Sequence, residues 1–525
     1  MPEGTHLHDE LAKSGARVTV DTVYGPVKGG RAANGAVVFL EIPYALPPVR
    51  FEDPLPLPQD YRYEDKEYIR EATYATQPSN DGQAQDMDPV DKLGYGQASE
   101  NPLFVNIVAP PSFPSQNNFP VRVYIHGGFL QFGSPHHLSG QAQYIAAERS
   151  EVWVNIGYRL SAFGFLASAK HNLTGNYGFK DQWLALEWIR ENISAFGGTP
   201  DDVQITGLSA GAHSVHQLLH HASQLPLGQK APFKSAQLQS NAILTNPRTP
   251  AQLEPQFDSL CGGLQLDPGS PDVVACLKDP KKIPWSAFTK LIEEEALGPY
   301  GTFRGCLSND WLSKSTNVMD WQQSGSLARG LREHGVQAVV VGDLTEEWYL
   351  YSIAHPITGP EDILPNLERY FPTSLAEGLI KGFPPLPKNA GSQEATRRYG
   401  DIMSCGQVHL PARLLARDLA AASFPVLRYE VRWTPEQLRP HGFVTHACDR
   451  HLWTLRLPSL EPGQDDVARA WVRRIAEETE ADNSELEGAE VDVKRMLTLK
   501  ENKTIGWTED ARWDEMLKLA KVIGA

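Results

Sequence analysis

The middle of the chain alternates short apolar runs with segments of helical period. Residues 121–128 and 152–160 are rich in β-branched and aromatic side chains and end in polar or glycine residues, as buried strands do. Residues 181–196 place apolar side chains at near-helical spacing and are followed by two glycines, which stop a helix. Residues 202–207 and 335–342 are further apolar runs. Strands that alternate with helices predict an α/β fold around a mostly parallel central sheet flanked by helices.

Two other patterns extend this predicted core. Residues 16–30 and 36–45 indicate short strands broken at glycine, which predicts an antiparallel edge at the N-terminal side of the sheet. Residues 245–335 and 355–440 are long, irregular and helix-leaning. We expect both segments to be helical insertions that cap the sheet and shape a pocket, so that residues 1–525 form a single large domain.

The composition narrows the range of functions. The 525 residues are 41% hydrophobic and 21% charged, which suffices for a large buried core, and the formal charge is −16. An acidic surface disfavours a nucleic-acid partner, and no stretch approaches the ~20 apolar residues of a membrane span. The first residues lack an apolar leader and the five cysteines are unclustered, so we expect a cytoplasmic protein with free thiols. The P-loop, G-x-G-x-x-G and H-E-x-x-H patterns are missing, and neither a cofactor nor a metal is expected.

One five-residue motif carries specific chemistry. Gly207-Leu208-Ser209-Ala210-Gly211 lies between a predicted strand and a predicted helix, and this G-x-S-x-G pattern occurs once in the chain. On such a sharp turn the serine hydroxyl projects above the sheet edge, and the flanking glycines are needed because a Cβ would collide with neighbouring backbone. The context predicts that Ser209 is a catalytic nucleophile.

A second glycine-containing segment, residues 124–129 (YIHGGF), follows another predicted strand. An oxyanion hole requires backbone N–H groups that a substrate carbonyl can approach closely, and glycine allows that approach. Gly127 and Gly128 could supply donors, joined by Ala210, the residue after the nucleophile. The alternative is an ordinary glycine turn that leaves a strand, with the His126 side chain merely packing beside it.

With these motifs the sequence resembles the type-B carboxylesterases, a family of the α/β-hydrolase fold that includes the cholinesterases. The most specific block of the resemblance is GNYGFKDQWLALEWIRENISAFGGTPDDVQITGLSAGA, residues 175–212. Shorter blocks are residues 39–51, 99–107, 120–128 and 157–166, so the resemblance covers most of the chain. It implies an α/β-hydrolase fold, ester hydrolysis through an acyl-enzyme, and a catalytic triad in the chain order Ser, acid, His.

The resemblance also suggests the acid of this triad. Members of the family place a glutamate a few residues after a strand that ends in glycine. In AVVVGDLTEEWYLY, residues 338–351, the spacing from Gly342 selects Glu347. Glu346 and Asp343 are the alternatives, because predicted element boundaries carry errors of a few residues.

The histidine of the family lies in a loop and has an acidic residue three positions later. Residues 445–449 (THACD) match this pattern, which selects His446 as the general base. His441 lacks the acidic residue at that spacing. His441 and His451 are nevertheless the alternatives, since a lone loop histidine is usually a surface residue.

Two positions near the predicted nucleophile depart from the family pattern. Phe129 stands where the oxyanion loop commonly has a third consecutive glycine. Its N–H could still donate, but a positive φ there would strain a phenylalanine, and its ring is expected to narrow the acyl side of the pocket. Leu208 replaces the glutamate that usually precedes the nucleophile, which argues against a choline ester.

Further side chains have supporting roles by the same resemblance. Ser240 is expected to brace the acid–base pair, the alternative being a buried structural hydroxyl. Arg50 with Glu100, and Arg159 with Asp181, resemble internal ion pairs of the family. Such pairs would hold loops in place without taking part in the chemistry.

The expected function is therefore that of a serine esterase. It would cleave small to medium-sized hydrophobic esters through Ser209, His446 and Glu347. A lactonase, amidase, thioesterase or acyltransferase would use the same acyl-enzyme, and a catalytically inactive binding module could use the same scaffold. The expected partner is a small-molecule ester, and the sequence leaves open whether the protein is a monomer or a homodimer.

Overall fold

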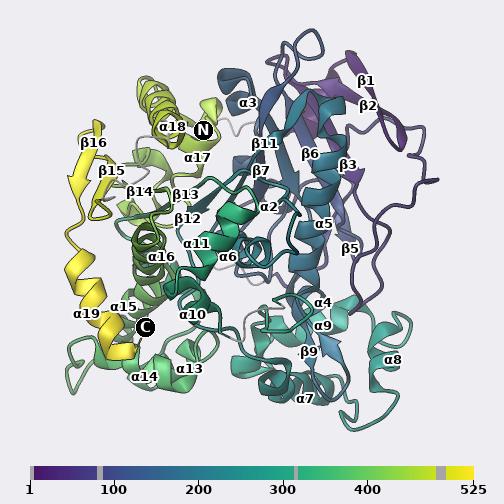
Figure 1. Ribbon diagram of the computed structural model, residues 1–525. Coiled ribbons are helices and arrows are strands. Elements are labelled where there is room, and N and C mark those ends of the chain that lie inside the picture. Colours follow the sequence, from purple (N-terminus) through teal and green to yellow (C-terminus); the bar gives the residue numbers. More distant parts are fainter. Residues whose placement is uncertain (1–4, 80–86, 313–316, 481–491, 525) are drawn as a thin grey trace.

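The computed structural model describes residues 5–79, 87–312, 317–480 and 492–524, which surround one large sheet (Figure 1). This 12-stranded sheet has the order β1-β2-β3-β6-β8-β7-β11-β12-β13-β14-β15-β16. In chain order its strands are β1 (Arg17–Thr22), β2 (Gly25–Arg31), β3 (Val37–Pro43), β6 (Phe104–Ala109), β7 (Phe119–Ile125), β8 (Val152–Ile156), β11 (Gly198–Leu208), β12 (Ser235–Gln239), β13 (Ala338–Leu344), β14 (Val426–Val431), β15 (Arg495–Leu499) and β16 (Ile505–Glu509). Two small sheets pair β4 (Thr73–Ala75) with β5 (Gln97–Ser99) and β9 (Ala167–Ser168) with β10 (Leu173–Thr174).

The pairing of the strands agrees with the sequence pattern. Every neighbouring pair from β8 to β15 is parallel. The N-terminal strands β1, β2, β3 and β6 pair antiparallel, as does β16 at the other edge. The mostly parallel sheet with an antiparallel N-terminal edge is therefore confirmed.

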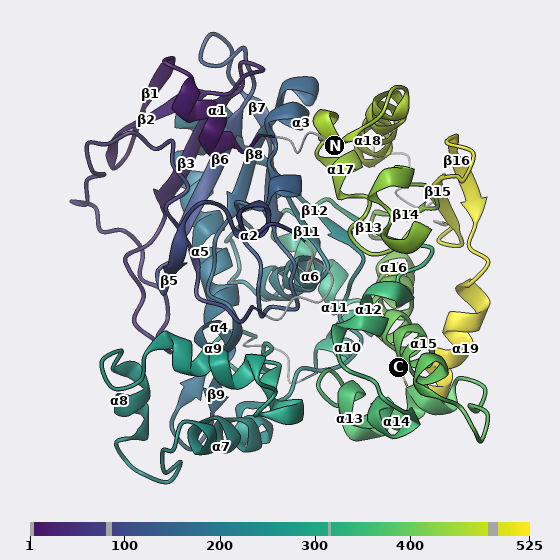
Figure 2. The same cartoon turned by 180° about the vertical axis from the view of Figure 1, so that it is seen from behind.

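Helices cover both faces of this sheet (Figures 1 and 2). Side chains of a strand alternate between the faces, so Val339 and Val341 join one buried core and Val340 joins the other. The first core includes residues of α5 (Tyr177–Asn192), α6 (Ala210–Ala222), α11 (Ser326–Glu333) and α16 (Leu410–Ala421). The second includes residues of α1 (Leu7–Lys13), α3 (Gln143–Arg149), α17 (Arg450–Trp453) and α18 (Gln464–Glu480).

The two helix-leaning segments follow strands β12 and β13. The first contains α7 (Glu254–Gly263), α8 (Val273–Lys278), α9 (Trp285–Glu293), α10 (Val318–Gln323) and α11, and its residues 313–316 lie outside the described part. After β13 come α12 (Trp348–Ala354), α13 (Ile363–Leu367), α14 (Thr373–Lys381), α15 (Ser392–Ser404) and α16. In both views α7, α8, α13 and α14 lie at the end of the molecule opposite the β1–β2 hairpin. Further α-helices of the described ranges are α2 (Pro89–Leu93), α4 (Ser161–Phe165) and α19 (Trp513–Ile523).

The structure differs from the sequence-based elements at two places. The range 355–440, expected as a helical insertion, also contains the core strand β14, which pairs with β13 and β15. Arg428 and Glu430 interrupt the apolar pattern of this strand, so it lacks the signature of a buried strand. The helix predicted at 181 begins at Tyr177. Within the described ranges, no helix has both the length and the apolar character needed to cross a bilayer.

Candidate active site

The turn that carries Ser209 joins the end of β11 to the start of α6. Ser209 has φ 59° and ψ −124°, a strained conformation that costs about 1–3 kcal/mol. A Cβ on Gly207 would lie 2.3 Å from the carbonyl carbon of Gly211, and a Cβ on Gly211 would lie 2.0 Å from the Ile125 carbonyl oxygen. Neither contact could be relieved without moving backbone, so both glycines of the motif are sterically required.

Glu347 and His446 are joined by a short hydrogen bond across 99 residues of sequence. Glu347 Oε2 lies 2.6 Å from His446 Nδ1, and both side chains are buried. The other carboxylate oxygen accepts the Leu344 N–H at 3.0 Å, which fixes the carboxylate just after β13. A carboxylate can only accept, so Nδ1 carries a proton and Nε2 is the basic nitrogen of the neutral ring. His446 and Ser209 line the same pocket of about 340 Å³.

The alternative acids are engaged elsewhere. Glu346 Oε2 accepts the N–H of Val444 at 2.8 Å. Asp343 Oδ2 lies 2.8 Å from His409 Nδ1 and 2.8 Å from Arg413 Nη1, in a buried cluster between β13 and α16. The spacing from Gly342 therefore selected the glutamate that contacts His446.

The alternative histidines also have other surroundings. His441 is exposed, and its ring lies 5.5 Å from the ring of Tyr349. His451 Nδ1 lies 2.7 Å from Ser459 Oγ, and burial lowers the pKa of His451 to about 4. Of the three candidates, His446 is the one that contacts Glu347.

The predicted oxyanion loop forms one wall of the pocket. Gly127, Gly128 and Phe129 all line it, and a Cβ on Gly127 would lie 2.9 Å from Ser209 Cβ. Gly128 has φ 109°, where a side chain would be strained, and its Cβ would meet backbone. Ala210 is the first residue of α6, and the first N–H groups of a helix have no partner within the helix. The glycine loop and the start of α6 thus lie on two sides of Ser209.

Phe129 has φ 56°, which is the left-handed conformation expected to strain a phenylalanine at this position. The surrounding aromatic residues stabilise it, because its ring centroid lies about 6 Å from those of Phe132, Tyr351 and Tyr370. Phe129 lines the Ser209 pocket and also a neighbouring smaller cavity. Phe129 is thus shared by the two spaces, as are Phe132 and Leu350.

The two predicted supporting residues have different surroundings. His126 Nδ1 donates to the Gly127 carbonyl at 2.9 Å and its ring stacks on Tyr158 at 4.5 Å, while burial lowers the pKa of His126 to about 4. This neutral ring supports the glycine turn. The N–H of Ser240 donates to the Gly342 carbonyl at 2.9 Å, but its hydroxyl forms no hydrogen bond with any residue that the structure describes. Bracing of the acid–base pair by Ser240 stays a prediction.

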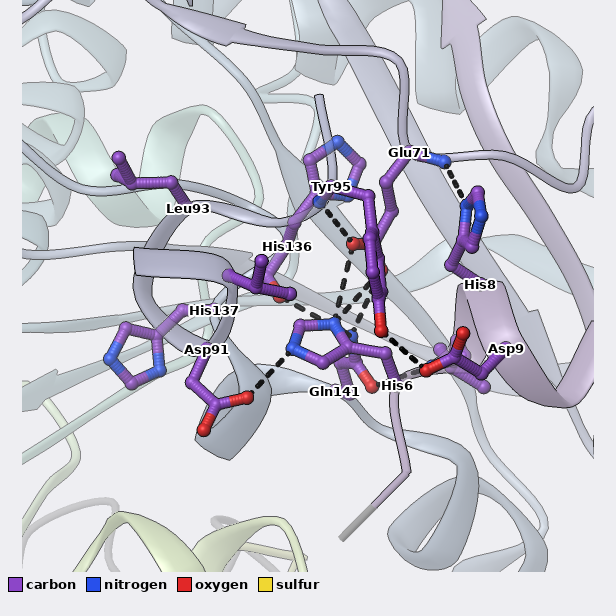
Figure 3. A network of polar contacts seen from close by, with 12 residues as sticks. His6, His8, Asp9, Glu71, Asp91, Leu93, Tyr95, His136, His137 and Gln141 are labelled. Carbon is purple, nitrogen blue, oxygen red and sulfur yellow. Dashed lines mark hydrogen bonds and ion pairs between the residues drawn. The ribbon is translucent and has the colours of Figure 1, made fainter. Parts of the chain in front are cut away.

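A polar network supports another wall of the pocket, residues 134–140 (Figure 3). His6 lies at its centre, with Nδ1 3.3 Å from Glu71 Oε1 and Nε2 3.1 Å from Asp91 Oδ1 on α2. Gln141 Nε2 lies 2.9 Å from His6 Nδ1 and also donates to a carbonyl of the wall. Sequence reasoning missed this network, because its members come from distant segments without a local motif.

The expected internal ion pairs are present. Arg50 Nε lies 2.5 Å from Glu100 Oε2, and Arg159 Nη2 lies 2.7 Å from Asp181 Oδ1. The second pair is buried, whereas in the first Arg50 is buried and Glu100 is partly exposed. Sequence reasoning passed over Arg450, which lines the Ser209 pocket four residues after His446.

Comparison with known proteins gives consistent matches. The sequence profile of the Carboxylesterase family matches residues 16–311. A carboxylic ester hydrolase of Gibberella moniliformis is 27% identical over 516 residues, covering 92% of this chain and 91% of that protein. An esterase/lipase of Schizosaccharomyces pombe is 27% identical over 513 residues, covering 92% of each. A solved structure of PNB esterase superposes with a TM-score of 0.73 at 25% identity, covering 95% of this chain and 99% of that chain.

The fold and these matches define the class of protein. A large, mostly parallel sheet flanked by helices, shared with PNB esterase over almost the whole chain, is the α/β-hydrolase fold. The chain belongs to the carboxylesterase family, and it is a carboxylic ester hydrolase.

Proposed function

We propose that the protein cleaves small to medium-sized hydrophobic esters with Ser209 as nucleophile, His446 as general base and Glu347 as the acid. The 2.6 Å contact of Glu347 with His446, in the pocket that Ser209 also lines, is the observation that carries this proposal. The pocket volume, about 340 Å³, is at the lower end of the range for small-molecule sites.

The geometry supports an acyl-enzyme mechanism. His446 Nε2 takes the proton of Ser209 Oγ while that oxygen attacks the ester carbonyl. Glu347 keeps the Nδ1 proton in place and stabilises the imidazolium that forms. The N–H groups of Gly128 and Ala210, with neighbouring amides, stabilise the negative carbonyl oxygen. The imidazolium then protonates the departing alcohol, and a water molecule attacks the acyl-enzyme to release the acid and restore the serine.

The lining of the pocket supports the proposed substrate class. Leu208, Phe132, Leu138 and Leu350 give it apolar walls that suit hydrophobic acyl or alcohol groups. Among its described lining residues there is neither an aspartate nor a glutamate, which disfavours a cationic choline ester.

The test is initial-rate hydrolysis of 4-nitrophenyl acetate by the wild-type enzyme and by Ser209→Ala. Loss of the nucleophile should lower kcat by about 10³-fold or more. Equal weak rates for both proteins would contradict the proposed nucleophile.

Two further variants test the acid. Glu347→Gln removes the charge that stabilises the imidazolium and should lower kcat by about 10³–10⁴-fold. Glu346→Gln is the matched control, because an amide oxygen can still accept the N–H of Val444. Equal losses in the two variants would argue against Glu347 as the acid.

A further inference from the structure

Arg450 is a buried cation in the Ser209 pocket. Its side chain is 3% exposed, and its three guanidinium nitrogens form no hydrogen bond with any described residue. The adjacent carboxylate, Asp449, accepts the indole N–H of Trp453 at 2.7 Å instead. Burial lowers the pKa of Arg450, yet an arginine stays protonated at any pH at which proteins fold. A buried charge without hydrogen-bond partners costs several kcal/mol, so it calls for a ligand.

The orientation of the guanidinium suits a ligand at its edge. Arg450 lies over the ring of Tyr124 at 3.5 Å from the ring centroid. This contact occupies one flat face of the guanidinium and fixes its plane. The N–H groups point along the edges of that plane, in the fork that matches a carboxylate with two parallel hydrogen bonds.

Among the described residues that line the pocket there is no aspartate, glutamate or lysine, and Arg450 is the only arginine. Two histidines near it, His137 and His451, also line the pocket, and burial lowers their pKa values to about 3 and about 4. Both rings are thus neutral near pH 7. His137 Nδ1 accepts the N–H of Ser139 at 3.2 Å, so its proton is on Nε2, which can donate. In Figure 3, His137 stands apart from the His6 network.

We infer that Arg450 recognises a carboxylate group on the substrate, with His137 as an additional donor, so that the preferred substrates are esters with a hydrophobic body and one free carboxylate. This inference rests on the proposed function, because it assigns the substrate class of the site that contains Ser209. A carboxylate would supply the missing acceptor and neutralise the buried charge.

The test compares matched pairs of esters that differ only in this charge. For the alcohol side, the pair is 4-acetoxybenzoate and 4-acetoxybenzamide; for the acyl side, it is monomethyl glutarate and its terminal amide. The wild-type enzyme should favour the carboxylate of at least one pair by about tenfold or more in kcat/KM, the range of charge-assisted hydrogen bonds. Arg450→Met should lower this ratio at least about tenfold, and Arg450→Lys should retain part of it.

Arg456→Met is the matched control. Arg456 is another buried arginine with an unpartnered nitrogen, but it is not among the described residues that line the pocket, so its loss should leave the ratio unchanged. A wild-type enzyme that hydrolyses both members of each pair at equal rates overturns the inference, even if Arg450→Met does not fold. A ratio that Arg450→Met leaves intact also overturns it. If no ester of either kind were hydrolysed, the proposed function itself would fail.

Discussion

At the scale of single residues, Phe129 lies where the pocket of Ser209 adjoins a second cavity. Phe129 lines both spaces together with Phe132 and Leu350, and Tyr370 and His355 line only the second. Replacing Phe129 with alanine should join the two and admit longer acyl chains. Each additional buried methylene is worth ~0.8 kcal/mol, so the ratio of kcat/KM for 4-nitrophenyl hexanoate over the acetate should rise roughly tenfold or more.

The control for this variant is Leu138→Ala, which enlarges the pocket on a wall that does not face the second cavity. It should change the chain-length preference much less than Phe129→Ala. An unchanged preference in Phe129→Ala would show that the ring does not limit the acyl side.

A site residue could be predicted from the sequence where a short motif or a fixed spacing marks it. Ser209 lies in a five-residue motif whose glycines the backbone requires, and Glu347 lies at a fixed distance from the end of a strand. Arg450 carried no such signal. Its place in the pocket depends on the turn before α17 and on the distant ring of Tyr124, which no short stretch of sequence reveals.

At the scale of elements, a buried ionic cluster joins the C-terminal strands to α16. Arg413 on α16 lies 2.8 Å from Asp343 at β13 and 2.8 Å from Asp510 after β16. Burial opposes the charge of Asp343, but Arg413 and His409 hold the pKa of that carboxyl well below its usual range. Arg413→Met would leave two buried carboxylates short of a partner and should lower the free energy of unfolding by about 3–5 kcal/mol.

Urea unfolding of the wild type and Arg413→Met measures this change. Lys290→Met on α9 is the control, because Lys290 pairs with Glu294 at 3.6 Å on the exposed surface. Exposed pairs four residues apart contribute only about 0.3–0.5 kcal/mol. A loss in Arg413→Met as small as in this control would show that the cluster adds no stability.

Ionic contacts of this kind explain why β14 was not predicted from the sequence. β14 carries Arg428, which pairs with Asp510, and Glu430, which pairs with Arg432 and Arg512. Charged side chains are rare in buried strands, so the sequence pattern there did not indicate one. The central strands β7, β8 and β13 contain few such residues and were predicted. The prediction failed at a strand whose buried charged side chains form ion pairs with residues from distant segments.

At the scale of the whole molecule, His6 joins the N-terminal segment to Glu71, Asp91 and Gln141, which support a wall of the Ser209 pocket. Burial lowers the pKa of His6, but hydrogen bonds and charges of Glu71 and Asp91 outweigh this and raise it above its usual value. Protonated His6 therefore stabilises the fold below the pKa of the unfolded chain, ~6.5, and this contribution is lost as the pH rises through the higher folded pKa.

The comparison of wild type with His6→Gln tests this assignment. The difference in Tm should be largest near about pH 6 and should shrink toward about pH 9, where His6 is neutral in both states. Asp91→Asn removes one of the carboxylates that raise the His6 pKa. The Tm difference between Asp91→Asn and the double variant Asp91→Asn/His6→Gln should therefore disappear at a lower pH than the difference between wild type and His6→Gln. A difference that grows with pH would have the wrong sign. It would mean that neutral His6, and not its charged form, joins the N-terminal segment to the wall of the pocket.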